Sequence, residues 1–334
     1  MITGGEEEEE EEQEEQEEQE EQEEEFGART EGNLIAETVE MMLELLLFAA
    51  LLLGAYFLLH MTFLKLPRCK STAKLHGKTA VVTGANTGIG KTTAMDLARR
   101  GARVILACRD RRRAEAAAQE IIQETGNSQV VFMHLDLSSL MNGGKTEDGF
   151  GMIFGVNHLG HFLLTVLLLE RLKASGRSRV VTVSSKAYKM GTVDFTCLRT
   201  HRDVSLGDSD LQLFHKYCSS KLCNVLFTHE LAKRLQGSDT TCYCLHPGTI
   251  QTEIGRYAGF WWSLLTKPIV FLFFVDPESG AQTTLHCALE QGIEHASGRF
   301  FSCCAPQLNI EPKATDDAAA AKLWELSERF CGLA

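Results

Sequence analysis

The sequence lacks paired cysteines at the spacing of a metal or redox motif. Its eleven cysteines include no CxxC pair, and the two nearest sets, Cys242-x-Cys244 and Cys303-Cys304, have no second pair at zinc-site spacing. This pattern argues against a zinc module and a disulfide framework, so we expect no metal and free thiols in a reducing compartment. Clusters of basic and aromatic residues are also missing, so we expect no nucleic-acid partner.

Negative charge is abundant but confined to one end of the chain. Glu6 to Glu25 is a run of glutamate broken by four glutamines. Without these 16 carboxylates the net charge of −12 becomes +4. Such a run repels itself and cannot bury apolar surface, so residues 1–33 are predicted to be a disordered tail. An inert low-complexity tail is favoured over an acidic interaction tail.

One long apolar run follows the tail. Leu45 to Leu64 carries no formal charge, and a helix of that length spans roughly 30 Å, the thickness of a bilayer core. Its length and acidic leader argue against a cleaved signal peptide, and a buried soluble helix is the alternative. We expect one transmembrane anchor within residues 41–66. Basic residues cluster after it, so the positive-inside rule places the C-terminal domain, residues 76–334, in the cytosol.

The stretch after the anchor predicts a strand, a glycine turn, a helix and a second strand. Ala80 to Thr83 is a short apolar run that suits a strand buried on both faces. The glycines of TGANTGIG permit a tight turn and a close backbone approach to a pyrophosphate at the start of the next helix. The cofactor-binding residues predicted in this turn are Gly84, Asn86, Thr87, Gly88, Ile89 and Gly90.

Residues beyond the next two strands bear on which nicotinamide cofactor binds. Arg109 directly follows the second strand, with Asp110 next to it. An arginine there suits the 2′-phosphate of NADP, whereas an acidic residue suits the 2′-hydroxyl of NAD, and we expect NADP(H). Asp136, at the end of the third strand, is placed to reach the adenine side, with a helix N-cap as its structural alternative.

A tyrosine and a lysine four residues apart predict a catalytic helix. In KYCSSK, Tyr217 and Lys221 would share one helix face. The ordinary pKa of tyrosine is about 10, and a neighbouring ammonium and an oxidised nicotinamide would both lower it towards neutral pH. Ser184 and Ser185 end a buried strand upstream, where a hydroxyl could hold the substrate oxygen. The pair alone is suggestive, and its context strengthens it.

Three further positions complete the predicted site. Asn157 lies in an apolar helical stretch, where an amide is costly without partners, so it either supports packing or binds a functional water. Pro247 and Gly248 follow another apolar strand and could bring backbone beside the nicotinamide. Thr252 comes shortly after them and is predicted to contact the cofactor.

Taken in order, the motifs TGANTGIG, NHLG, VSS, YCSSK and HPGTIQT resemble the short-chain dehydrogenase/reductase family. With its apolar N-terminal run, the chain is most similar to the microsomal retinol dehydrogenases. The resemblance implies an α/β fold with a doubly wound parallel sheet of Rossmann type, and an NADP(H)-dependent oxidoreductase interconverting retinol and retinal. It implies the endoplasmic reticulum membrane, with a mitochondrial membrane as the alternative. The implied roles are Tyr217 as acid/base, Lys221 for lowering its pKa and binding ribose, Ser185 for polarising the carbonyl, and Asn157 for holding a relay water.

A second apolar segment, Ala258 to Val275, is interrupted by Lys267-Pro268, which argues against a second span. In the resembling family this region forms a substrate lid, and an apolar lid would suit a lipophilic, retinoid-like substrate. Packing in the core or in a homodimer accounts for these aromatics equally well.

The sequence departs from the family pattern at one junction. The family has a helix and an Asn-Asn-Ala-Gly strand end before the Asn157 helix, but here DLSSL runs directly into MNGGKTEDGF. About 28 residues, one helix–strand unit, are missing after Leu140, so the sheet should lack its central strand. Either Phe150–Val156 joins the sheet as a substitute strand, or the fold fails. The alternative function is therefore an inactive splice or gene-model variant, or a membrane-tethered binding protein without activity.

Overall fold

The structure is a computed structural model, and it describes residues 29, 34, 37–58, 67–137, 151–195, 210–248 and 276–334. The chain divides into two units, Met1–Lys65 and Leu66–Ala334. Several predicted features lie outside the described residues. These are the Glu-rich run, the junction after Leu140, Thr252 and the apolar segment Ala258–Val275.

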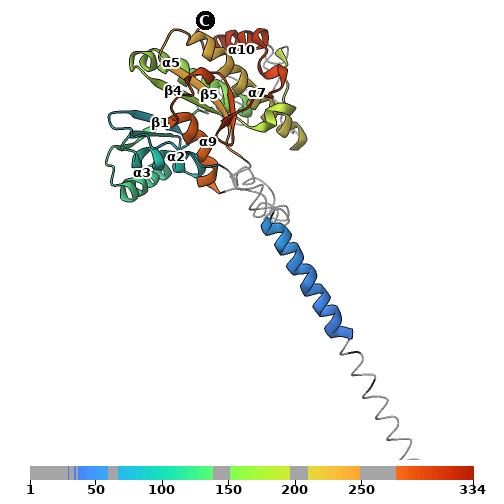
Figure 1. The fold of residues 1–334 in the computed structure, drawn as a ribbon. Helices are drawn as coiled ribbons and strands as arrows, with labels where there is room; N and C mark the ends of the chain where they lie inside the picture. The colour runs from blue at the N-terminus through green and yellow to red at the C-terminus, as the bar shows by residue number, and fades with distance from the viewer. Residues whose placement is uncertain are drawn as a thin grey trace, which may run out of the picture. The chain divides into compact units, whose positions relative to one another are not determined.

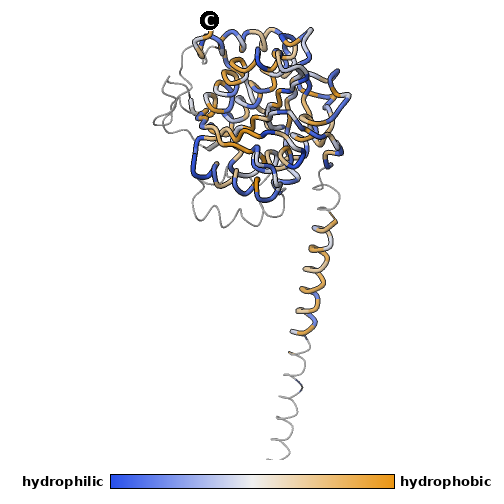
Figure 2. Tube along the Cα trace, turned by 90° about the vertical axis from the view of Figure 1, so that its left-hand side faces the viewer, coloured by the Kyte–Doolittle hydropathy of each residue, from blue (hydrophilic) through white to orange (hydrophobic). Residues whose placement is uncertain are grey.

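In the first unit, the described residues contain one helix long and apolar enough to cross a membrane. It runs from Glu37 to Leu58, with a mean hydropathy of 2.2 and no burial inside the protein. Figure 2 shows it as largely apolar, with hydrophilic positions towards its N-terminal end. The helix begins before the predicted span, Leu45–Leu64, and residues 59–64 of that span lie outside the described part.

The second unit begins with a compact alternation of strands and helices, which we call the first half. Its elements are β1 (Thr79–Thr83), α2 (Gly88–Arg99), β2 (Arg103–Cys108), α3 (Arg111–Thr125) and β3 (Val130–His134). The strands are parallel in the order β1-β2-β3. The Asp110 carboxylate caps α3 by accepting a bond from the Arg113 N–H at 3.0 Å, and Gly126, at φ 68°, ends that helix.

The remainder of this unit, which we call the second half, has its own four-stranded sheet in the order β4-β5-β6-β7. Strand β7 is antiparallel to β6, and the other pairs are parallel. The strands are β4 (Ser178–Val183), β5 (Thr240–His246), β6 (Phe300–Ser302) and β7 (Ala305–Pro306). The main helices are α4 (Met152–Phe154), a π-helix (Gly155–Leu159), α5 (Gly160–Ala174), α7 (Asp210–Arg234), α9 (Pro277–Leu289) and α10 (Asp317–Phe330). Short 3₁₀ turns are Lys186–Met190, Glu294–Ala296 and Pro312–Ala314.

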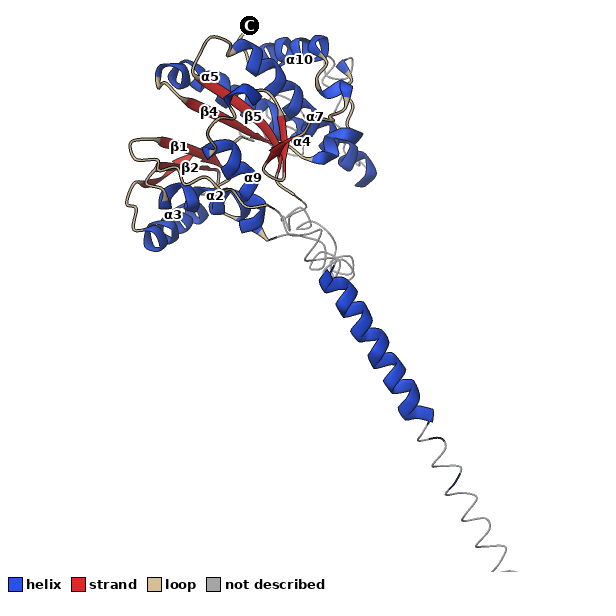
Figure 3. Cartoon of the chain, viewed as in Figure 1, coloured by secondary structure: helices blue, strands red, loops and turns tan. Residues whose placement is uncertain are grey.

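The sheet of the second unit is split between β1 and β4. Within the described residues these strands share no ladder, and Figure 3 shows two separate groups of strands. The prediction that β1 is buried on both faces is wrong, because Val81 is 44% exposed, as expected for a strand that has lost a neighbour. Val183 of β4 is 39% exposed for the same reason. The missing central unit therefore divides the sheet, as the junction predicted.

The predicted substitute strand does not form over residues 152–156, and Gly151 makes only an isolated β-bridge. Met152–Phe154 is α-helical and Gly155–Leu159 is a π-helix, while Phe150 lies outside the described residues. The physical reason is the apolar pattern of this stretch, which buries Phe154 and Leu159 against α7 in a helical register. The Asn157 helix is thus retained at the expense of the sheet.

Helix α9 joins the two halves. It packs on α2 of the first half and on β4, β5 and β6 of the second (Figure 1). Ala281, Leu285 and Leu289, four residues apart, enter the core of the first half. Cys287, on another face of the helix, packs with Tyr243 and its neighbours in the second half. Two faces of the same helix thus pack into the cores of the two halves.

Candidate active site

The glycine turn after β1 has the geometry of an anion cradle. Gly84 and Gly88 have φ of 61° and 54°, a region that favours glycine. A Cβ on Gly90 would lie 2.5 Å from the Gly84 carbonyl oxygen, so no side chain fits there. Helix α2 begins at Gly88, and its N-cap, Thr87, makes no side-chain capping bond. Its first-turn N–H groups therefore point out of the turn without a side-chain acceptor, and they fit a pyrophosphate.

Beside this turn lie charged side chains that the sequence analysis did not assign. Asn86 and Thr87 line a shallow pocket together with Lys91, Arg113, Ala116, Ala117 and Glu120. Lys91 pairs with Glu120 at 2.5 Å, and Arg113 pairs with Asp110 at 3.6 Å. The position of Lys91 directly after the glycine turn could have indicated in the sequence that it lies beside this pocket. Ile89, the remaining turn residue, packs against the core of the first half.

The residues near the predicted binding site for the adenosine end of the cofactor differ in their environments. Arg109 is exposed directly after β2, where a ribose phosphate would be reached. Asp110 is engaged as the cap of α3. Asp136 is half-buried just beyond β3, and the chain after Leu137 lies outside the described residues, so its predicted contact with the adenine side stays a prediction.

Tyr217 and Lys221 lie one turn apart on α7, as predicted. The Lys221 Nζ is 5.5 Å from the centroid of the Tyr217 ring. The Ser185 side chain lies near the Tyr217 hydroxyl and acts on its pKa. The end of β4 holds the helix in place, because Lys221 Nζ donates to the Val183 carbonyl at 3.2 Å and Ser184 Oγ donates to the Lys221 carbonyl at 2.7 Å. Three of the four predicted catalytic residues therefore meet at the carboxyl end of β4.

Burial controls the protonation of this pair. Burial raises the pKa of Tyr217 above its ordinary value, and the Ser185 side chain opposes that rise. Burial also lowers the pKa of Lys221 to about 8. In the protein alone, the phenol is therefore shifted away from neutral pH, in the direction opposite to the sequence-based expectation.

Asn157 reaches the catalytic helix through an intermediate hydroxyl. Its Nδ2 donates to Ser220 Oγ at 3.0 Å, and that hydroxyl donates to the Tyr217 carbonyl at 2.7 Å. Asn157 lies in the π-helix Gly155–Leu159, and such bulges are frequent at functional sites. Its amide is thus satisfied and attached to the backbone that carries Tyr217.

His161 links the two halves near this site, and the sequence reading missed it. Its Nε2 lies 3.3 Å from Thr83 Oγ1 at the end of β1, and its Nδ1 lies 3.0 Å from the Val156 carbonyl oxygen. Burial lowers the pKa of His161, with the nearby Lys221 acting in the same direction. Its signal was the NHLGH pattern, one turn beyond Asn157.

The turn after β5 completes the described part of the site. Pro247 is buried, and Gly248 has a φ of 104°, which a side chain would strain. The preceding His246 has a buried Nδ1 without a partner in the described part of the chain. Thr252 lies outside the described residues, so its predicted contact with the cofactor stays a prediction.

Comparisons with known proteins agree with this geometry. The family described as short chain dehydrogenase matches residues 78–145. Dehydrogenase/reductase SDR family member 13 of Bos taurus is 46% identical, covering 86% of this chain and 82% of that protein. Retinol dehydrogenase 11 of Homo sapiens is 44% identical, covering 86% and 98%. A solved structure of an uncharacterized Mycobacterium paratuberculosis protein is 33% identical, covers 78% and 95%, and has a TM-score of 0.60.

The alignment lengths are consistent with a missing unit. The match to the bovine relative extends over 316 positions, whereas 86% of 334 residues is about 287, so about 29 positions have no residue of this chain. This deficit is close to the length of one helix–strand unit. It agrees with the split between β1 and β4.

Proposed function

Because this chain belongs to the short-chain dehydrogenase/reductase family of nicotinamide-dependent oxidoreductases, we propose that it interconverts a lipophilic, retinoid-like alcohol and its aldehyde with NADP(H). The observation that carries the proposal is the meeting of Tyr217, Lys221 and Ser185 at the end of β4. The glycine turn of the first half supplies the fit to a dinucleotide pyrophosphate.

The chemistry follows from the positions of these groups. When bound, the nicotinamide supplies or accepts the hydride. In the reducing direction the Tyr217 hydroxyl donates its proton to the carbonyl oxygen of the aldehyde, and the Ser185 hydroxyl donates a hydrogen bond to the same oxygen. The Lys221 ammonium favours the phenolate that remains. Asn157 fixes the helix backbone through Ser220, and in this proposal it also holds a relay water.

The preference for NADP over NAD is supported by charge. Arg109 is exposed at the end of β2, whereas Lys91 and Arg113, beside the glycine turn, are paired with Glu120 and Asp110. Asp110 is occupied as a helix cap, so it is poorly placed to bind a free ribose hydroxyl. A guanidinium fork suits a phosphate, and the site therefore favours the 2′-phosphate.

The substrate and the membrane are inferred from the relatives and the N-terminal helix. A relative named retinol dehydrogenase 11 supports a retinoid or similar lipophilic substrate. The apolar helix Glu37–Leu58 supports anchoring to the endoplasmic reticulum membrane, with residues 76–334 as the catalytic domain in the cytosol. A homodimer remains part of the proposal.

The test is turnover of retinal and retinol by the full chain in microsomes. We expect NADPH-dependent reduction of retinal, a weaker reaction with NADH, and a loss of about 10²–10⁴-fold in kcat for Tyr217→Phe. Ser219→Ala, a nearby hydroxyl on α7 outside the proposed site, serves as the control and should retain turnover. Equal turnover by Tyr217→Phe and the unmodified chain would contradict the proposed acid/base.

The split sheet favours a second candidate function, a tethered cofactor-binding protein without turnover. The glycine turn belongs to one half and Tyr217 to the other, and no ladder joins them in the described residues. Protection of the full chain against heat by NADPH, without turnover of retinal, would support this candidate. Absence of protection at saturating NADPH would contradict both candidates and favour an inactive variant. Reading the genomic interval between the codons of Leu140 and Met141 would show whether an in-frame exon encodes the missing unit.

A further inference from the structure

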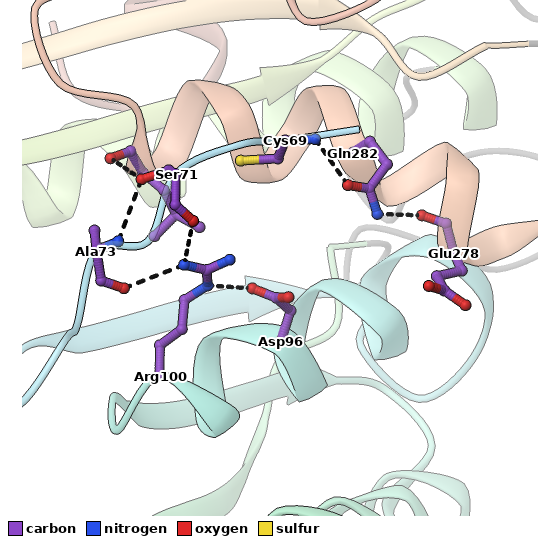
Figure 4. Close-up of polar contacts among 8 residues, drawn as sticks. Cys69, Ser71, Ala73, Asp96, Arg100, Glu278 and Gln282 are labelled. Atoms are coloured by element: carbon purple, nitrogen blue, oxygen red, sulfur yellow. Dashed lines mark hydrogen bonds and ion pairs between the residues drawn. The ribbon is translucent and has the colours of Figure 1, made fainter. Parts of the chain in front are cut away.

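Away from the active site, residues 67–75 run along α9 and form what we call the strap. The Cys69 N–H donates to Gln282 Oε1 at 3.0 Å, and Ser71 Oγ donates to the Leu289 carbonyl at 3.1 Å. Arg100, at the end of α2, donates to the Ser71 carbonyl at 2.7 Å. Figure 4 shows these contacts, with the strap lying between α9 and Arg100. The strap therefore ties α9 to the first half.

We propose that Cys69, His286 and Glu290 form a binding site for Zn²⁺ or a similar thiophilic divalent cation, between the strap and α9. One ligand atom from each residue lies within 4.8 Å of the other two. His286 and Glu290 are four residues apart on α9, and His286 Nδ1 is 3.6 Å from Glu290 Oε2. All three side chains are partly buried. The proposal is independent of the oxidoreductase activity.

The spacing of these atoms suits one small ion. Zinc binds thiolate sulfur at about 2.3 Å and imidazole nitrogen at about 2.0–2.1 Å, so tetrahedral ligand atoms lie roughly 3.3–3.8 Å apart. The histidine–glutamate separation is already in that range. Thiolate, imidazole and carboxylate together form a donor set typical of zinc. Three protein ligands leave the fourth position for a water or another thiol.

Cys304 contacts both the strap and α9, although it is not one of the three clustered ligands. It sits in the two-residue turn between β6 and β7, where Cys303 and Cys304 have φ of 54° and 56°. Such turns normally carry Asn-Gly, because other residues are strained at positive φ. The Cys304 Sγ donates to the Pro67 carbonyl at 3.3 Å. Its backbone N–H donates to Thr283 Oγ1, one turn before His286 on α9. The strained turn thus holds a second thiol against both elements of the site.

Proton release accompanies binding at this site. A cysteine binds a metal ion as the thiolate, so binding depends on pH and releases protons. Each thiol that becomes a ligand loses one proton to solvent and forms one sulfur–metal bond. No oxidation or reduction is involved.

The site would be structural because of what it connects. The strap, α9 and the β6–β7 turn come from three distant parts of the sequence, and α9 is the helix that packs on both halves. A shared ion would fix these three elements to one another. Zinc sites of this type contribute directly to folding stability. We therefore expect metal removal to lower the thermal midpoint of the chain.

The test uses the full chain, purified in detergent and reconstituted with Zn²⁺ or Co²⁺ alone. We expect one equivalent of tightly held Zn²⁺, and for Co²⁺ a sulfur-to-metal charge-transfer band in the near ultraviolet. Cys69→Ser and His286→Gln should remove the equivalent and the band, and Glu290→Gln should weaken binding by at least tenfold. Cys331→Ser, a partly buried cysteine elsewhere in the chain, should change neither.

Three results would overturn the proposal. One is failure of the unmodified chain to retain zinc through gel filtration. Another is equal loss of zinc in the Cys331→Ser control. The third is a mass two hydrogens below that of the reduced chain, with the loss mapped to a Cys69–Cys304 disulfide. Circular dichroism of each variant checks folding, and if Cys69→Ser does not fold, the cobalt spectrum of His286→Gln decides.

Discussion

The cores of the two halves of the second unit consist of different types of residue. The core of the first half is largely alanine and aliphatic, with Ala85, Ala94, Ala98 and Ala114 each fully buried. The core of the second half is aromatic, with the Phe162 and Trp324 ring centroids 4.9 Å apart and the Phe227 and Trp324 rings stacked. Small residues let α2 approach its strands closely, which the glycine turn requires, whereas large rings lock the helix that carries Tyr217.

The comparison teaches that, in the described residues, packing and side-chain contacts hold the two halves together and a shared ladder does not. Each half has its own sheet and buried clusters, but no ladder joins β1 to β4 in the described residues. The described connections include the packing of α9, the strap, the contact between His161 and Thr83, and the close approach of Leu137 to Gly160 on α5. The predictions below test whether these are sufficient.

The largest effect is expected from restoring the missing unit. We would insert the corresponding segment of human retinol dehydrogenase 11 between Leu140 and Met141. Two new ladders at ~1 kcal/mol per hydrogen bond, with new buried side chains, should raise the free energy of unfolding by about 5 kcal/mol or more. Denaturant unfolding and retinal reduction would measure it, and turnover should rise at least tenfold. A scrambled insert of equal length is the control, and equal gains from both inserts would contradict a missing strand.

A matched pair of core substitutions tests whether the halves unfold separately. Leu106→Ala in β2 and Leu245→Ala in β5 each remove a fully buried side chain, at a cost of about 2–5 kcal/mol. Because no ladder crosses between the sheets, each variant should lower hydrogen-exchange protection mainly in its own half. Leu167→Ala, at a position 65% exposed, should change stability by less than about 0.5 kcal/mol. Equal losses in both halves from either variant would show that they unfold as one unit.

Cofactor binding should depend on the first half far more than on the second. Gly90→Val places atoms where a Cβ would already be 2.5 Å from the Gly84 oxygen, so the turn must open. We expect NADPH affinity to fall at least tenfold, or about 1.4 kcal/mol, as measured by fluorescence titration. Tyr217→Phe, in the second half, should bind NADPH within about twofold of the unmodified chain. Retained affinity in Gly90→Val would contradict the assigned cradle.

Acid should loosen the second half first. Burial lowers the pKa of His158 from 6.5 to about 3, so between these values the unfolded chain binds a proton that the folded chain does not, and stability falls as the pH falls. At pH 6, this one fully buried group lowers the free energy of unfolding by about 0.8 kcal/mol relative to its value at high pH. Thermal midpoints at pH 7.5 and 5.5 should differ less in His158→Gln than in the unmodified chain. An unchanged difference would contradict the assignment.

The carboxylates of the protein do not obscure this window. The pKa values of Asp276, Glu294 and Asp317 are lowered in the folded protein. The stability that these carboxylates contribute is therefore lost only at lower pH, where they become protonated. Hydrogen exchange at pH 5.5 should therefore show reduced protection around α5 and α7 before β1–β3. Equal loosening of both halves would assign the effect elsewhere.

The family, the fold class and the missing unit were all predictable from the sequence. The family and the fold class follow from local motifs in a fixed order. The absence of one expected motif from that order indicates the missing unit. The grouping of Tyr217, Lys221 and Ser185 was also predictable, because a four-residue spacing and a strand end fix it locally. The burial of β1 was predicted wrongly, because a strand's own pattern does not show whether its neighbour exists.

Other contacts could not have been predicted. Cys69 and His286 lie more than 200 residues apart in sequence, and nothing in their spacing indicates that they meet. The contact between His161 and Thr83 likewise depends on how the halves pack. The predicted fall in the pKa of Tyr217 omitted burial, which raises it in the protein alone. Tertiary packing decides each of these outcomes.

Helix α9 has a consequence for the precision of the reaction. In a continuous sheet, hydrogen bonds set the distance between the hydride site and the acid to fractions of an ångström. Here, among the described residues, side-chain packing along α9 links the hydride site to the acid. Such packing resists displacement less than a hydrogen-bond ladder does. Displacement of reacting groups by about 1 Å can cost 10²-fold in rate. The halves can therefore each be well formed while turnover varies with thermal motion between them, so rate should depend more steeply on temperature and viscosity than cofactor affinity does.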